Sequence, residues 1–522
     1  MAESIPEAKY DVKEGKIVKI TMRRTGTVSV GGLCAVLCVA TLAALAFLAG
    51  CVGGGTASTE TGTNTPDKTE IDGGHTSEDP TASETDTDMP DGPEDSASET
   101  QTETETEPET EPETEPETEY DISKPDFHPE LSDGYYNAAD YGAVGDGVTD
   151  DTEAVRNCLL AAYAKSGTAY FPAGTYRITE TITLPKNDSK VFRVMGATGA
   201  ELVGDSRLKG NVLQVNMKYN FFLYNLDITH KGEGSCLDAL FVQAKWCRFT
   251  GSASAGGADV VSFHGSNCRF VECSFDVNDP DVFALSYIRW QNEISINDHV
   301  VDNVFRGVGK GILVGNGTTT DGRCEGLKIN GNYFYNTGAE QIRVAEILHL
   351  NVAHNTMYGC TGSAIVLTQQ GSGADGVYIN DNTIRMGEGA LACISTEEGS
   401  GVYVSSVNIN NNTLIGGQYG LYETMDIARL HMRENRVSGQ TVAGIAVDTR
   451  KCEKPHFFFD NVVEESEGVL CFYLPGRGLV AFARNVVNQP STVGRAFTKK
   501  FEEGCVDRKG DNLTRLTTDG QN

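Results

Sequence analysis

The feature that most constrains this chain is a short pattern that recurs from about residue 220 to residue 488. Each copy has two alternating apolar residues, then an Asn, and then one further apolar residue; the clearest copy runs from Leu327 to Phe334. The Asn slots, two of which hold Cys, lie 22 to 30 residues apart. They are Asn225, Cys247, Cys273, Asn303, Asn332, Asn355, Asn382, Asn412, Asn435, Asn461 and Asn485.

A repeat of this length indicates a solenoid, and the alternation within each copy indicates strands rather than helices. Asn tolerates a left-handed turn, and its amide can bond to the Asn of the next unit. A second apolar run, such as Ala364–Leu367, follows each turn and gives three short strands per coil. We therefore predict an all-β fold, a right-handed parallel β-helix over residues 126–495, rather than a β-sandwich with coincidental Asn spacing.

The first coil of such a solenoid needs a cover, because its strand edges and apolar core would otherwise meet water. Residues 137–165 provide one. Apolar residues at helical spacing predict a short N-terminal capping α-helix from Asp151 to about Lys165, and Asp150 with Glu153 suits a capping box at its start. We expect residues 496–522 to form a polar C-terminal tail.

The N-terminal part carries targeting features. Residues 1–24 are mixed in charge, and the uncharged, apolar residues 25–52 are long enough to span a bilayer. Basic residues before this run predict a cytoplasmic N-terminus. Its end, Leu48-Ala-Gly-Cys51, resembles a bacterial lipobox, which implies cleavage of the signal and lipidation of Cys51; an uncleaved signal-anchor is the alternative. Both place the protein on the extracellular face of the cell membrane.

Composition limits the remaining segments. Residues 53–125 consist mainly of Thr, Glu, Asp, Ser, Pro and Gly, which predicts a disordered, acidic stalk. The net charge of −31 and the lack of a basic stripe argue against a nucleic-acid partner. The Cys residues after residue 52 are scattered without metal-ligand spacing, so we interpret most of them as small buried apolar side chains.

Three motifs lie around the predicted cap: Asp140-Tyr-Gly-Ala143, Thr149-Asp-Asp-Thr152 and Tyr170-Phe-Pro-Ala-Gly-Thr-Tyr176. Together they resemble the start of the pectate-lyase-like superfamily. That superfamily includes polygalacturonases, rhamnogalacturonases, epimerase-like proteins and phage tailspikes, so the resemblance implies a parallel β-helix and a polysaccharide partner. The polygalacturonase motifs Asn-Thr-Asp, Asp-Asp, Gly-His-Gly and Arg-Ile-Lys are missing from the predicted coils, so no catalytic residue is carried over.

Candidate site residues come instead from their position in the coils. Successive coils lie about 4.8 Å apart, so residues at one register form a column on the surface. Polar residues recur nine positions before the Asn slot or near that edge, and Asp238 and His264, on adjacent coils, could touch. The candidate catalytic residues are Asp238, His264, Arg289, Arg343, Glu346 and Asp426.

Two further groups could assist. Trp290 could stack on a sugar face, and Asp276, Asp279 and Asp281 could hold Ca²⁺, a hard ion that prefers several oxygen ligands. Ca²⁺ is the one candidate cofactor. The alternative for all of these residues is that they are polar only because strand ends and turns meet water.

Such a column suits two reactions. Hydrolysis of a glycosidic bond needs two carboxyl groups, and elimination from a uronate needs a base and a cation. We predict a surface-anchored glycoside hydrolase or polysaccharide lyase that acts on an extracellular polysaccharide. The alternative is a non-catalytic, carbohydrate-binding or adhesive β-helix protein.

Overall fold

The computed structural model describes residues 8–13, 16–22, 121–127, 133–186, 190–251, 258–288, 296–315, 324–336, 338–399, 404–425, 427–450, 454–507 and 516–519. The chain divides into two units, residues 1–108 and 109–522. In the first, β1 (Ala8–Lys13) and β2 (Lys16–Met22) pair antiparallel. The predicted membrane segment at residues 25–52, including Cys51, lies outside the described residues. Within the described ranges, no helix is both long and apolar enough to cross a membrane.

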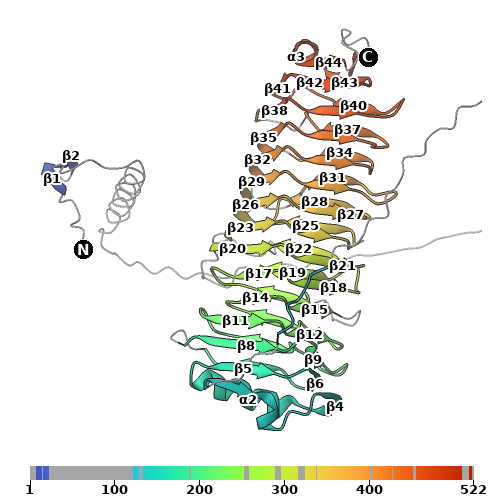
Figure 1. Ribbon diagram of the computed structural model, residues 1–522. Coiled ribbons are helices and arrows are strands. Elements are labelled where there is room, and N and C mark those ends of the chain that lie inside the picture. Colours follow the sequence, from blue (N-terminus) through green and yellow to red (C-terminus); the bar gives the residue numbers. More distant parts are fainter. Residues whose placement is uncertain are drawn as a thin grey trace, which may run out of the picture. The chain divides into compact units, whose positions relative to one another are not determined.

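The second unit is a right-handed parallel β-helix (Figure 1), so the predicted fold class is confirmed. Between the two ends, each coil contributes one strand to each of three long parallel sheets. Sheet 1 contains β7 (Ile182–Leu184), β10 (Leu213–Val215), β13 (Leu237–Ala239), β16 (Val261–Phe263), β19 (Phe283–Tyr287), β22 (Lys310–Val314), β25 (Glu340–Val344), β28 (Ser363–Thr368), β31 (Ala392–Glu397), β34 (Tyr419–Glu423), β37 (Ala443–Val447), β40 (Leu470–Leu474), β43 (Ser491–Gly494) and β45 (Leu516–Asp519).

The other two sheets follow sheet 1 along each coil. Sheet 2 contains β3 (Tyr135–Asn137), β5 (Thr168–Phe171), β8 (Phe192–Gly196), β11 (Phe221–Tyr224), β14 (Gln243–Lys245), β17 (Arg269–Val271), β20 (Ile296–Val301), β23 (Glu325–Asn330), β26 (Ile347–Ala353), β29 (Ala374–Asn380), β32 (Val404–Asn410), β35 (Ile427–Arg433), β38 (His456–Phe459) and β41 (Val480–Ala483). Sheet 3 contains β4 (Asp146–Asp150), β6 (Gly174–Ile178), β9 (Ala200–Gly204), β12 (Asp227–His230), β15 (Arg248–Gly251), β18 (Ser274–Val277), β21 (Val304–Gly307), β24 (Tyr333–Phe334), β27 (Thr356–Tyr358), β30 (Thr383–Arg385), β33 (Thr413–Ile415), β36 (Arg436–Ser438), β39 (Val462–Glu464), β42 (Asn485–Val487) and β44 (Cys505–Asp507).

The core lies inside the coils and is built from apolar residues stacked at one register. In sheet 1, Leu237 pairs with Val261 and Val261 with Leu285, and all three are fully buried. Phe305 stacks on Phe334 in the next coil, with ring centroids 4.6 Å apart. Each such side chain contributes about 1.5–3 kcal/mol by leaving water. The alternation seen in the sequence therefore fixes which face of each strand points inward.

The predicted Asn ladder is confirmed at the turn between sheets 2 and 3. The Nδ2 atom of Asn332 donates to Oδ1 of Asn355 at 2.9 Å, and Asn355 donates to Asn382 at the same distance. The left-handed residue, however, is usually the one before the Asn, as at His354 (φ 55°) and Asp381 (φ 55°). The Asn itself remains free to bond along the solenoid axis, which explains why this slot selects an amide.

Cysteine takes the same slot in the early coils. The backbone N–H of Cys273 donates to Oδ1 of Asn303 at 2.9 Å, so the Asn ladder ends on the backbone of Cys273. The thiol has no amide group that could continue the ladder to the preceding coil. The ten Cys residues that the structure describes are all free thiols and buried. The interpretation of these residues as small apolar side chains is confirmed for that part of the chain.

The N-terminal cap contains a short 3-10 helix, η1 (Ala138–Tyr141), and α2 (Thr152–Ala164), which covers the first coil (Figure 1). The predicted helix is confirmed, but the predicted capping box is wrong. The residue that precedes the helix is Asp151, whose carboxylate accepts the backbone N–H groups of Val144 (2.7 Å) and Gly145 (3.1 Å). The sequence alone could not show that this carboxylate turns away from the helix toward the preceding loop.

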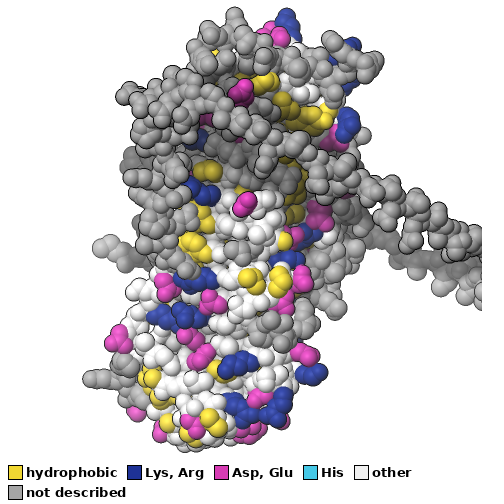
Figure 2. Space-filling model, turned by 90° about the vertical axis from the view of Figure 1, so that its right-hand side faces the viewer, with side chains coloured by type: hydrophobic (Ala, Val, Ile, Leu, Met, Phe, Trp, Pro, Cys, Tyr) yellow, Lys and Arg dark blue, Asp and Glu magenta, His cyan; other side chains and the backbone are white. Residues whose placement is uncertain are grey.

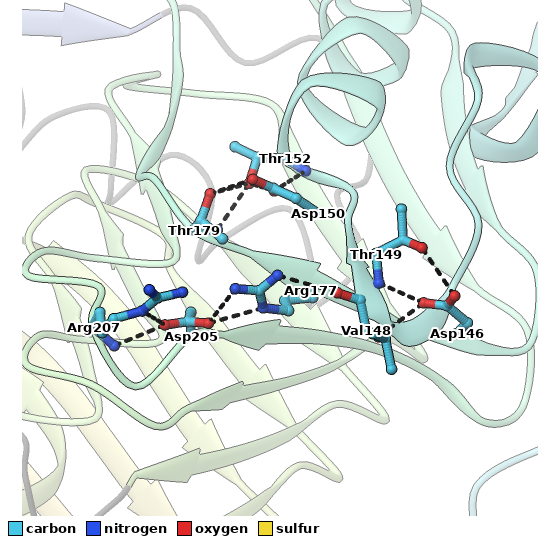
Figure 3. Close-up of polar contacts among 9 residues, drawn as sticks. All are labelled: Asp146, Val148, Thr149, Asp150, Thr152, Arg177, Thr179, Asp205 and Arg207. Atoms are coloured by element: carbon cyan, nitrogen blue, oxygen red, sulfur yellow. Dashed lines mark hydrogen bonds and ion pairs between the residues drawn. The ribbon is translucent and has the colours of Figure 1, made fainter.

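Figure 3 shows that the other motif aspartates are also structural. Asp150 accepts hydrogen bonds from the hydroxyls of Thr152 (2.6 Å) and Thr179 (2.7 Å). Arg177 binds Asp205 through two nitrogens, at 2.8 and 2.7 Å. These bonds tie the cap to the first coils.

The C-terminal end is also covered. Residues 498–507, predicted as part of a polar tail, instead form α3 (Thr498–Gly504) and the sheet 3 strand β44. Phe501 is fully buried, with its ring centroid 5.0 Å from Phe482 and 5.4 Å from Phe472. The aromatic residues therefore outweigh the polar composition of this segment.

A second departure concerns residues 121–127, here called the N-terminal strap. Lys124 forms an ion pair with Asp227 of β12, and Asp121 forms one with Arg306 of β21 at 3.0 Å. The side chain of Ile122 is buried. Residues 121–125, predicted to end a disordered stalk, thus pack along sheet 3. Their one apolar residue and two charges find partners that the sequence could not reveal.

Candidate functional site

The candidate site lies on the outer face of sheet 1, where two rows of side chains run along the solenoid. The first row follows the register of Asp238, one position per coil. Its members are Gln214, Asp238, Ser262, Ser286, Leu313, Arg343, Val366, Ser395, Tyr422, Ala446 and Tyr473. The second row lies three residues earlier on each coil. Its members are Asn211, Ser235, Asp259, Phe283, Lys310, Glu340, Ser363, Ala392, Tyr419, Ala443 and Leu470.

The predicted contact between Asp238 and His264 is confirmed. Nε2 of His264 lies 2.9 Å from Oδ1 of Asp238, and Nδ1 lies 2.7 Å from the carbonyl oxygen of Ile288. A carbonyl only accepts, so Nδ1 carries a proton and donates it. The other contact then also needs a proton, held on Nε2 or on the carboxyl group. Asp238 and His264 therefore share one proton between a buried ring and a partly exposed carboxyl group.

A second carboxyl group, which the sequence reasoning missed, belongs to Asp259. It accepts hydrogen bonds from the hydroxyl of Ser286 and from the backbone N–H of Phe283, the latter at 3.2 Å. Burial raises the pKa of Asp259, against the lowering effects of these hydrogen bonds and of Lys310. A carboxyl group with a raised pKa keeps its proton to higher pH, as a general acid requires.

Arg343 lies further along the same face. Its guanidinium binds Glu340 at 2.6 Å and Glu397 at 2.7 Å. Glu340 belongs to the second row and Glu397 ends β31, two coils beyond Arg343. The sequence pattern indicated Arg343 but neither acidic partner, because Glu340 and Glu397 do not share the offset from the Asn slot that marks the predicted column.

Glu346 does not belong to this outer face. It is fully buried and accepts the backbone N–H of Ser372 at 3.2 Å, so it holds a connection between coils. The prediction that it stands in one column with Asp238 and His264 was wrong. Asp238 lies within β13, whereas His264 follows β16 and Glu346 follows β25 by two residues. The connection from sheet 1 to the Asn slot varies in length, which shifts the register.

Three other predicted residues, Arg289, Trp290 and Asp426, lie outside the described residues. The three candidate Ca²⁺ ligands, Asp276, Asp279 and Asp281, lie within the described residues, and they make different contacts. Asp276 of β18 faces Arg248 at 3.7 Å on sheet 3, and Asp279 accepts the backbone N–H of Asp281 at 3.0 Å within one loop. No group of three or more His, Cys, Asp or Glu side chains is placed to hold a metal ion in the part of the chain that the structure describes.

Charges of both signs alternate elsewhere on the solenoid. Figure 2 shows the side that faces right in Figure 1, where basic and acidic side chains are interspersed among the coloured residues. On sheet 3 many of these charges form pairs, such as Arg248 with Asp276 and Lys124 with Asp227. On sheet 1, by contrast, the hydrogen-bonded pair of Asp238 and His264 lies near Asp259, whose pKa is raised by burial.

The chain is similar to a known protein family, to curated proteins and to solved structures. The family model described as rhamnogalacturonase A/epimerase, pectate lyase-like, matches residues 135–448. Mannuronan C5-epimerase AlgE2 of Azotobacter vinelandii is 43% identical over 76 residues, which cover 13% of this chain and 8% of that protein. A probable glucan endo-1,3-beta-glucosidase of Arthroderma benhamiae is 29% identical over 222 residues, which cover 36% and 25%. The chain thus spans only a small part of these curated relatives.

Two solved structures are similar in fold. The A-module of mannuronan C-5 epimerase AlgE6 of Azotobacter vinelandii has a TM-score of 0.46 and 15% identity, covering 67% of this chain and 99% of that one. PfbA, a surface adhesin of Streptococcus pneumoniae, has a TM-score of 0.41 and 14% identity, covering 67% and 92%.

Proposed function

The chain belongs to the rhamnogalacturonase A/epimerase, pectate lyase-like family, and we propose that it is a surface-anchored enzyme that cleaves glycosidic bonds in an extracellular polysaccharide. The observation that carries this proposal is the pairing of two proton-transfer groups on one face of sheet 1. Asp238 with His264 forms one group, and Asp259 forms the other. The apolar segment at residues 25–52 and the lipobox-like Cys51 support the membrane anchor.

The spacing of the two groups suits a sugar chain laid across the coils. Asp259 belongs to the coil next to that of Asp238 and bonds to Ser286, one coil further on, so the two carboxyl groups lie within about two coils of each other, or no more than about 9.6 Å along the solenoid at the usual strand spacing. Carboxyl groups about 6.5–9.5 Å apart leave room for a water molecule between base and sugar, as in inverting hydrolysis. In that reaction Asp259 donates its proton to the leaving oxygen, and Asp238, supported by His264, takes a proton from the attacking water.

The same groups could carry out elimination from a uronate. The pair of Asp238 and His264 would remove the proton next to the sugar carboxylate, and the bond to the leaving oxygen would break as a double bond forms. Asp259 would protonate that oxygen. Lys310 or Arg343, on the same face, would neutralise the carboxylate as negative charge builds up. Hydrolysis and elimination thus differ in their products more than in the residues they need.

The test is incubation of the full chain with a panel of neutral and uronate polysaccharides, with Ca²⁺ or a chelator. New reducing ends without ultraviolet absorbance indicate hydrolysis, and new ends with an absorbing double bond indicate elimination. Loss of activity in the chelator would support a role for Ca²⁺. Binding without any product would contradict the enzymatic proposal and favour the alternative, a carbohydrate-binding adhesive protein.

A further inference from the structure

The two rows on sheet 1 change character beyond Arg343. From β28 to β40 their members carry no charge: Ser363, Val366, Ala392, Ser395, Tyr419, Tyr422, Ala443, Ala446, Leu470 and Tyr473. Three of these ten residues are tyrosines. This end of the face therefore cannot bind a ligand through ion pairs of the two rows, and it offers aromatic surface instead.

The tyrosines lie against one another. The rings of Tyr419 and Tyr422 stack with their centroids 4.4 Å apart and their planes 15° apart. Burial raises the pKa of Tyr419, and the nearby hydroxyls of Tyr422 and Tyr473 raise it further. Three side chains from two coils thus form one cluster.

Two alanines lie between the tyrosines on the strand β37. Ala443 and Ala446 of β37 occupy the same outward rows, yet they are only 1% and 3% exposed. Their register neighbours on β34 and β40 include Tyr419, Tyr422 and Tyr473. One face of Tyr419 and one face of Tyr422 are taken up by their mutual stacking, so the ring of Tyr473 is the most exposed of the three. Tyr473 remains 41% exposed.

We propose that Tyr419, Tyr422 and Tyr473, here called the tyrosine platform, bind neutral hexopyranose units of a polysaccharide by stacking. Sugars of this class present a flat face of C–H bonds to an aromatic ring and hydroxyls to its phenol group. The platform continues the rows that carry Asp238 and Asp259, so one extended chain can lie along both. In this respect the inference rests on the proposed function, and it assigns the neutral part of the substrate to the platform.

Distance separates the platform from the proposed chemistry. Tyr422 lies three coils from Arg343 and seven from Asp238, or about 14 and 34 Å at the usual strand spacing. The platform therefore binds sugars several units away from the bond that is cleaved. It should affect the affinity for long chains and leave the chemical step unchanged.

The test is binding of laminarin, a neutral β-glucan, and of polygalacturonate to the full chain by calorimetry. We expect Tyr422→Ala and Tyr473→Ala each to weaken laminarin binding about tenfold, since exposed aromatic residues often dominate binding surfaces. Tyr422→Phe and Tyr473→Phe keep the ring and should stay within about twofold of the unmodified protein. Tyr378→Ala is the matched control, because Tyr378 is 43% exposed on the sheet 2 strand β29.

Each result separates the platform from the proposed catalysis. Laminarin binding that is absent, or unchanged in both alanine variants, would overturn the platform. Platform-dependent binding of polygalacturonate in place of laminarin would overturn its assignment to neutral sugars. Tyrosine-dependent laminarin binding by a chain that cleaves no polysaccharide would leave the platform standing and refute the catalytic proposal. Because Tyr473 is largely outside the core, unaltered thermal unfolding of its variants would show that the fold is retained.

Discussion

The two halves of sheet 1 share one backbone and carry opposite surfaces. From β13 to β25 the outer rows hold Asp238, Asp259, Lys310, Glu340 and Arg343, whereas from β28 to β40 they hold only uncharged residues. Both halves keep the same parallel register, so the backbone does not cause the difference. The solenoid sets the spacing of the positions, and the side chains alone decide whether a stretch can transfer protons or stack against a sugar.

The largest expected effect comes from a substitution in the charged half of sheet 1. Asp259→Asn removes the proposed acid while keeping its size, so we expect turnover to fall on the order of 10²–10⁴-fold. Binding to the tyrosine platform should not change. Asp375→Asn is a matched control, because Asp375 also accepts a serine hydroxyl, that of Ser405 at 2.6 Å, but on sheet 2. Equal activity in both variants would remove Asp259 from the mechanism.

Inside the coils the two halves are alike, since each buries a carboxyl group. Burial raises the pKa of Asp298 to about 7, against the lowering hydrogen bonds from Tyr287 and Cys268, and it raises the pKa of Glu465 to about 7. A raised pKa means that the folded protein holds the proton more tightly. The stability gained is therefore complete below about pH 4 and is lost as the pH rises through about 7.

For Asp298 this loss is on the order of 4 kcal/mol between about pH 4 and pH 8. Urea unfolding at several pH values measures it. Asp298→Asn is neutral throughout, so its free energy of unfolding should fall less steeply over this window, and Glu465→Gln should show the same trend. A pH dependence identical to that of the unmodified chain would mean that neither carboxyl group is protonated in the fold.

The Asn ladder gives the next largest effect. Asn382 accepts the N–H groups of Asn355 and donates to Asn412 and to the carbonyl of Val352. Asn382→Ala leaves buried polar groups without partners, and we expect a loss of about 3 kcal/mol, seen as a lower urea midpoint. Asn380→Ala, two residues away on the outer side of sheet 2, should cost well under 1 kcal/mol.

The early coils offer a contrast within the ladder. Cys273 fills the same slot with a small buried thiol. Its backbone N–H donates to Oδ1 of Asn303, but its side chain has no amide group that could bond to Asn303. Cys273→Ala should therefore cost no more than about 1.5 kcal/mol, less than Asn382→Ala. An equal cost would mean that cavity formation, rather than the amide bonds, dominates at this turn.

The smallest effect concerns the N-terminal strap. Lys124→Ala and Arg306→Ala each remove a partly exposed ion pair, worth at most about 1 kcal/mol. We expect faster proteolytic cleavage within residues 121–127, most clearly at low salt, where the ion pairs of the unmodified protein are least screened, and no change in the unfolding temperature of the solenoid. Cleavage at an unchanged rate would mean that the ion pairs do not hold the strap.

The sequence predicted what repeats and missed what does not. The turn slots recur from residue 225 onward and the inward apolar residues recur along the coils, so the solenoid and the ladder could be predicted. The cap helix could be predicted from its own helical spacing of apolar residues. Asp238 and His264 could be predicted because they stand one coil apart, each nine residues before its turn slot. Glu346 was misplaced because the offset crosses a connection of variable length, and Asp259 was missed because its carboxyl group reaches sheet 1 from the preceding turn.

The tyrosine platform was missed for a related reason. Tyr419 and Tyr473 lie 54 residues apart, and only the pairing of β34, β37 and β40 brings them together. Positions counted from the Asn slot do not align residues on sheet 1, because the connection between sheet 1 and the Asn slot varies in length. Counting from the inward residues of sheet 1 itself, such as Leu421 and Ile445, would have aligned the two rows.

The central claim, that sheet 1 carries the sugar chain across both halves, is tested most directly by a crystal structure of the Asp259→Asn variant with an oligosaccharide of the polysaccharide that the protein turns over. The account predicts electron density for the sugar along the outer face of sheet 1, with one glycosidic oxygen beside residue 259 and a pyranose ring on Tyr422 or Tyr473. Sugar bound on sheet 2 or sheet 3, with sheet 1 empty, would contradict it.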